Sequence, residues 1–218
     1  MKQVRQLKDP TRNAIRNVIE PWLSNSGFVP AEKMSFNRLR GPLIDHISFE
    51  FGRWGRGEVI YAYFSVHLVE DPVTSLHTHH AGGRLGASWY PEDRDACKAA
   101  AEAMLDNLRL SAFLWFDEID SISKYEGAWF DSGIAVAFAA IARSDVELAR
   151  IYLRDALARK APVVYSSGYP GWRSNEHGRS QDEVDALKDA LAAIESGTVD
   201  VWRRKIREQR LNELGMKR

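Results

Sequence analysis

Cysteine and long apolar runs are both scarce in this sequence. Cys97 is the single cysteine among 218 residues, so no disulfide can form within the chain, which is compatible with a reducing compartment. No apolar run approaches the roughly 18 residues that cross a membrane. The first residues also lack the apolar core of a signal peptide. We therefore expect a cytoplasmic protein that does not enter a membrane.

Net charge is absent as well. Lysine and arginine together number 30, aspartate and glutamate also number 30, and the formal net charge is therefore zero. A neutral chain has no overall electrostatic attraction for nucleic acid, so a nucleic-acid partner is not expected. The basic run at residues 203–210 is accordingly interpreted as a solvated helix face.

The motifs of common enzyme classes are missing too. The segment at residues 82–86 reads GGRLG, which lacks the spacing and the lysine of a nucleotide-binding loop. The sequence has no GxSxG elbow, no HExxH helix and no CxxC pair. These absences favour a binding protein over an enzyme and leave the question of catalysis open.

Residues 43–69 predict a long β-hairpin around which the rest of the chain is organised. Apolar side chains alternate along both arms, and this period of two places each set on one face of its strand. The segment GRWGRG between the arms supplies the turn. The alternating apolar residues are Leu43, Ile47, Phe49, Phe51, Ile60, Ala62, Phe64, Val66 and Leu68. We expect other elements to cover this apolar face.

Helical periodicity dominates the segments on either side of the hairpin. One helix is predicted from Thr11 as its N-cap, and another is predicted from Pro91, with an apolar stripe that covers the sheet. We therefore predict an α+β fold: an antiparallel sheet of three to five strands, helices packed on one face, and a helical C-terminal half. The expected division is an α+β domain at residues 1–130 and a helical extension at residues 131–218.

The extension is predicted to contain a helical hairpin, a long loop and two further helices. Ser144 and Glu147 have the spacing of a capping box, which would start the second helix of the hairpin. The loop at residues 161–179 places Tyr169 and Trp172 among glycines and serines. Loops of this length are usually functional or disordered. Because an exposed tryptophan is costly, docking or binding by this loop is slightly favoured.

The first half of the chain resembles the bacterial domain-of-unknown-function 4304 family, over about residues 15–125. The resemblance lies in the order of its motifs: a helix ending in Leu–x–x–x–Gly–Phe, a strand with Phe and Arg, two long strands, a Trp-containing strand and a Trp–Phe–Asp segment. The residues that carry it are Leu23, Gly27, Phe28, Phe36, Arg38, Trp89 and the segments 44–51, 61–71 and 115–117. The resemblance implies an α+β domain in a bacterial protein, and it brings no established activity and no catalytic residues.

The second face of the predicted hairpin is rich in polar and aromatic side chains. In either register that pairs the apolar sets, His46 lies opposite Tyr63 or Ser65, and His67 lies roughly 5–8 Å away. Such a face can bind another protein or a small ligand, or it can be a solvated outer face, which antiparallel sheets often have. The candidate binding residues are His46, Ser48, Glu50, Tyr61, Tyr63 and His67, with Tyr169 and Trp172 of the loop.

The segment LHTHH suggests a possible metal site. His77, His79 and His80 lie within four residues, and imidazole is a good zinc ligand. A further ligand would have to come from His67, Glu70 or Asp71. Two hypotheses therefore stand: a non-catalytic binding module, such as a neutralising or accessory factor, with no cofactor; and a metal-dependent hydrolase that uses zinc at the histidine cluster. We favour the interpretation of the LHTHH segment as a solvated loop, and we favour the binding module over the hydrolase.

This preference predicts that protein purified without an affinity tag contains no stoichiometric zinc. Elemental analysis measures the zinc content directly. One equivalent of zinc that disappears when His77, His79 and His80 are all replaced by alanine would favour the hydrolase instead.

Overall fold

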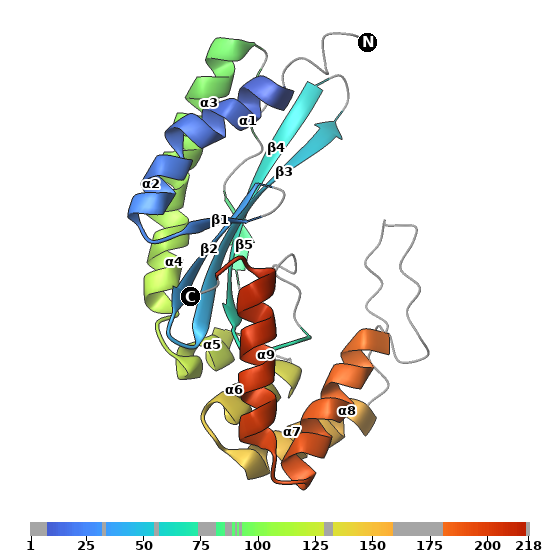
Figure 1. Cartoon of the computed structure of the whole chain (residues 1–218). Helices are drawn as coiled ribbons and strands as arrows, with labels where there is room; N and C mark the ends of the chain where they lie inside the picture. Colours follow the sequence, from blue (N-terminus) through green and yellow to red (C-terminus); the bar gives the residue numbers. More distant parts are fainter. Residues whose placement is uncertain are drawn as a thin grey trace.

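The described strands form a five-stranded antiparallel sheet in which spatial order follows chain order (Figure 1). The computed structural model describes residues 8–31, 34–54, 57–73, 82–85, 89, 91, 93–128, 133–158 and 181–216. The strands are β1 (Val29–Ala31), β2 (Ser35–Arg40), β3 (Leu43–Trp54), β4 (Gly57–Leu68) and β5 (Gly82–Arg84). The sheet and its helices confirm the predicted α+β class.

Helices precede and follow the sheet, and they make up the described C-terminal half. They are α1 (Lys8–Val18), α2 (Glu20–Asn25), α3 (Arg94–Asn107), the π-helical segment η1 (Leu108–Ala112), α4 (Phe113–Glu118), α5 (Ile122–Ala128), α6 (Gly133–Ala142), α7 (Val146–Ala158), α8 (Gln181–Glu195) and α9 (Val199–Glu213). Figure 1 shows α1 to α4 along one side of the sheet and α9 on the other. The division of the chain at residue 130 stays a prediction.

The β3–β4 hairpin has the predicted alternation. Ile47 pairs with Phe64 and Phe49 pairs with Ala62, so these side chains share the face that the helices cover. The helical stripe predicted to cover this face is buried; it consists of Cys97, Ala101, Met104 and Leu105 of α3 and Leu108 at the start of η1. The apolar face of the sheet and this stripe therefore belong to one hydrophobic core.

A buried carboxylate interrupts the apolar face near the β2–β3 turn. Asp45 is fully buried, and its Oδ2 accepts hydrogen bonds from Arg38 Nε at 2.8 Å and Arg40 Nε at 2.7 Å. Arg40 also donates to the Ile119 carbonyl at 2.9 Å, beyond the end of α4. The Arg38 guanidinium lies 4.8 Å from the centre of the Phe28 ring. These contacts connect the sheet to the helical layer and to the turn after α2.

Two predicted helix starts are wrong. Thr11 is not an N-cap: it lies inside α1, buried, with its hydroxyl 3.2 Å from the Cys97 sulfur. Pro91 does not begin α3, because the Asp93 side chain caps that helix by accepting a hydrogen bond from the Ala96 N–H. Thr11 packs against α3, a contact that the local sequence does not encode, whereas Asp93 is an exposed aspartate of the kind that commonly caps a helix.

The helical hairpin of the C-terminal half is confirmed as α6 and α7, but its predicted cap is not. Ser144 has a φ of 64° and belongs to the turn. The side chain that accepts a hydrogen bond from the α7 N-terminus is Asp145, which receives the Leu148 N–H at 3.2 Å. Gly197, with a φ of 71°, ends α8, as a left-handed position after a helix requires.

The core predicts a difference between the two faces of β3 and β4. Phe49→Ala should lower the free energy of unfolding by about 3–5 kcal/mol, because it leaves a cavity in a packed core. The Phe49 side chain is 2% exposed, whereas Tyr63 on the other face is half-buried. Tyr63→Ala should therefore cost much less in urea unfolding. Equal costs for the two variants would show that both side chains are packed alike.

Candidate functional site

The polar face of the sheet divides into a closed half and an open half. In the closed half, His46 pairs with Ser65 in the β3–β4 register, and both are buried. His46 Nδ1 lies 2.7 Å from the Asn37 side-chain oxygen, and His67 Nε2 lies 2.7 Å from Ser65 Oγ. The two imidazole rings have centroids 6.1 Å apart, as the sequence predicted. Because His46 and His67 are at most 1% exposed, they are inaccessible to a partner in this state.

The C-terminal end of the described chain covers part of this face. Leu214 is buried against Ile44 and Val69 in a small second hydrophobic cluster, beside the half-buried Leu39 and Met216. The alternative of a solvated outer face is therefore wrong for the closed half. This contact could not be predicted from the sequence, because Leu214 lies far along the chain from Ile44 and Val69.

Arginines of α9 hold that helix against the end of the sheet. Arg203 and Arg207 approach Glu70 Oε1 at 3.5 and 3.9 Å, and Glu70 is buried. Arg207 donates a hydrogen bond to the Gly41 carbonyl at 3.1 Å, and Arg203 donates to the Ala142 carbonyl at 3.0 Å. The interpretation of residues 203–210 as a solvated face is therefore wrong for these two side chains. Glu70, considered as a metal ligand, faces arginines instead.

The open half lies toward the tip of the hairpin and contains four side chains that we call the tyrosine patch: Glu50, Tyr61, Tyr63 and Arg84. Glu50 pairs with Tyr61, and Tyr63 pairs with Arg84 of β5, so all four share one face. The tyrosine rings have centroids 6.3 Å apart, and the Arg84 guanidinium lies 5.4 Å from the Tyr61 ring centre. Glu50 and Arg84 are exposed and the tyrosines are half-buried. Arg84 was not among the candidates from the sequence, because its place beside Tyr63 depends on the register of β4 and β5.

Ser48 lies between the two halves. It pairs with Tyr63 across the hairpin and with Ser35 on the other side. Its side chain is buried, and its hydroxyl has no hydrogen-bond partner within the described ranges. An unpaired buried hydroxyl is costly. Ser48 therefore places a buried hydroxyl without a described partner next to the tyrosine patch.

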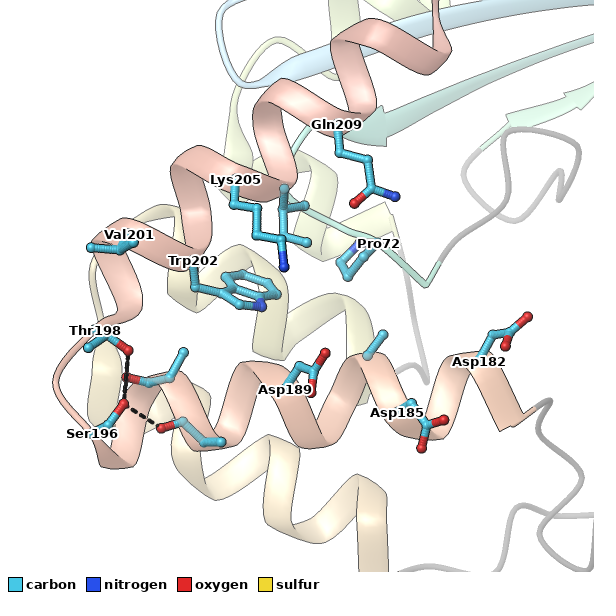
Figure 2. Close-up of a pocket in the computed structure, with 14 residues that line it drawn as sticks. Pro72, Asp182, Asp185, Asp189, Ser196, Thr198, Val201, Trp202, Lys205 and Gln209 are labelled. Atoms are coloured by element: carbon cyan, nitrogen blue, oxygen red, sulfur yellow. Dashed lines mark hydrogen bonds between the residues drawn. The ribbon is translucent and has the colours of Figure 1, made fainter.

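A hollow lies between α8 and α9, away from the sheet face, with a volume of about 790 Å³. Figure 2 shows Asp182, Asp185 and Asp189 along α8, with Asp189 opposite Trp202 and Lys205 of α9. None of these residues was a candidate from the sequence. The sequence shows the i, i+3, i+7 spacing of the aspartates, but it does not show that α9 lies opposite them.

Several predicted site residues lie outside the described residues. These are the histidines His77, His79 and His80 and the loop residues Tyr169 and Trp172. Among the residues that the structure does describe, no three histidine, cysteine, aspartate or glutamate side chains form a metal-binding group. The zinc hypothesis therefore stays a prediction.

Several of the residues that carry the family resemblance lie together where α2 meets the sheet. Gly27, with a φ of 84°, turns the chain from α2 toward the sheet beside the Arg38 side chain. Arg38 contacts Phe28 and Asp45, as described above, and donates to the Ser26 carbonyl at 3.3 Å. These motif residues connect helix and strand, and their contacts are explained by folding without a catalytic role.

Comparisons with family models, curated proteins and solved structures returned no match to this chain. None of the described helices combines the length and apolar composition that crossing a membrane requires. The function of this chain must therefore be inferred from the geometry of its surfaces.

The covering role of the C-terminus predicts an unequal effect of two substitutions near α9. Leu214→Ala should lower the free energy of unfolding by about 2–3 kcal/mol, because the side chain is 3% exposed and packs on the sheet. Val201→Ala is the control, since Val201 lies on α9 but is 58% exposed, and its cost should stay within about 0.5 kcal/mol. Thermal or urea unfolding measures both. A Leu214→Ala variant as stable as the wild type would mean that the C-terminus is not docked.

Proposed function

We propose that this chain is a non-catalytic, cytoplasmic protein-binding module that engages its partner through the tyrosine patch. The observation that carries the proposal is the arrangement of Tyr61, Tyr63 and Arg84, in which an exposed guanidinium lies 5.4 Å from a half-buried ring. Tyrosine and arginine are the side chains enriched at the energetic centres of protein interfaces. A bacterial neutralising or accessory role is the more specific form of this proposal, and it depends on the family resemblance.

The position of the patch supports a protein partner over a small ligand. The patch lies on the face of a sheet, whereas small molecules bind in concave sites that enclose most of their surface. Its rigid rings are held by two paired strands, so little conformational entropy is lost when a partner binds. Glu50 and Arg84 add opposite charges at its margins, which would fix the orientation of the partner.

The proposal predicts that Arg84→Glu removes binding to the native partner. Immobilised wild-type protein should capture a discrete partner from an extract of its native cells, and the Arg84→Glu variant should lose it. The charge change also removes the contact with the Tyr61 ring. Quantitative mass spectrometry of the captured proteins measures the difference.

A matched control variant is Arg109→Glu. Arg109 is also an exposed arginine beside an aromatic ring, at 5.2 Å from the Trp22 ring centre, but it lies in η1 within the helical layer. This variant should capture the partner as well as the wild type. Equal capture by both variants, or equal loss, would contradict binding at the tyrosine patch.

A further inference from the structure

The groove between α8 and α9 is open along its length. The two helices meet at the turn that contains Ser196 and Thr198, and they diverge from there (Figure 1). The hollow between them extends from this turn to Asp182 and Pro72 at its wide end (Figure 2). Because the groove is open along its length, it would leave a small molecule largely exposed, but it can receive an elongated segment of a partner.

One wall of the groove is acidic. Asp182, Asp185 and Asp189 are exposed, and the spacing i, i+3, i+7 places them in a row about 10 Å long on α8. None of the three forms an ion pair with another described residue. Asp185 accepts one hydrogen bond, from the Gln181 amide at 2.8 Å. The wall thus presents to the groove three negative charges that form no ion pair with a described residue.

The α9 wall is largely apolar. Trp202 stacks on Phe138, with ring centroids 6.1 Å apart and an interplanar angle of 9°, and this contact holds the indole beside the groove. Ile206 is half-buried next to it. Val201, at the rim, is 58% exposed and adds apolar surface to this wall. The groove therefore combines an apolar wall with an acidic wall.

We propose that this groove binds a cationic amphipathic helix of a partner protein. A helix with lysine or arginine at i, i+3 and i+7 matches the spacing of the three aspartates, because both follow the same helical period. Its apolar stripe would then lie on Trp202, Ile206 and Val201. This surface is separate from the tyrosine patch and does not depend on it.

Lys205 determines which way the partner helix faces. It lies on the α9 wall, opposite the aspartates, and its amine points into the groove (Figure 2). A cation placed against α9 would be repelled by Lys205, so the basic stripe must face α8. The groove therefore selects a helix whose basic and apolar stripes are adjacent, and not one that is basic on all sides.

A synthetic peptide tests the proposal. The probe is a fluorescein-labelled helical peptide with lysines at i, i+3 and i+7 beside a leucine stripe, and binding is followed by anisotropy. The full chain should bind it, and the Asp182→Asn, Asp185→Asn, Asp189→Asn variant should bind about tenfold more weakly or worse. A peptide with glutamate in place of lysine should not bind, and salt should weaken the lysine peptide.

The control removes the same charge elsewhere. Asp95→Asn, Glu102→Gln, Asp106→Asn changes three exposed acidic residues on α3, so its net charge equals that of the groove variant. It should bind the peptide like the wild type. Val201→Lys is an independent variant that places a cation at the rim, and it should also weaken binding. Circular dichroism checks that each variant is folded.

Three results would overturn the proposal. The first is no binding of the lysine peptide to the wild-type chain. The second is an equal loss in the groove variant and in the α3 control, which would mean that the peptide responds only to net charge. The third is concentration-dependent dimerisation in sedimentation that the groove variant abolishes, which would make a second copy of this chain the occupant.

Discussion

The arrangement of the layers depends on the ion pairs that the buried Asp45 carboxylate forms with two arginines. The carboxylate accepts hydrogen bonds from Arg38 and Arg40, and these arginines reach the Ser26 and Ile119 carbonyls in turns after two different helices. Separating Asp45 from the arginines would leave a buried charge unpaired, which is strongly destabilising. The three side chains therefore act as a unit. The unit fixes β2 and β3 against the helical layer. It thereby determines which face of the hairpin is left for the C-terminal half.

That second face is only partly available for binding, and this limits where function can lie. Arg203 and Arg207 hold α9 at Glu70, and Leu214 packs on the sheet beyond them. The covered half contains the two histidines that the sequence marked as binding candidates. The uncovered half contains the tyrosine patch. The same placement of α9 also forms one wall of the groove between α8 and α9.

The hairpin could be predicted from the sequence because period-two alternation acts locally: Ile47 faces Phe64 as expected, and His46 faces Ser65. The burial of this face could not, because the side chain that packs on Ile44 beside His67 is Leu214, a residue far along the chain. One predicted helix cap was wrong for a related reason. Thr11 has the chemistry of a cap, but its hydroxyl contacts Cys97 across the α1–α3 interface. Arg84 was missed because its role appears only in the strand register opposite Tyr63.

The central claim is that the half of the sheet face that contains His46 and His67 is closed in the folded chain. Diethyl pyrocarbonate modification, followed residue by residue by mass spectrometry, tests it most directly. The account predicts that both histidines react many-fold more slowly in the native chain than in urea-unfolded chain, because both are at most 1% exposed. Equal reaction rates in the native and unfolded chains would contradict closure of this face and return these histidines to the accessible binding surface.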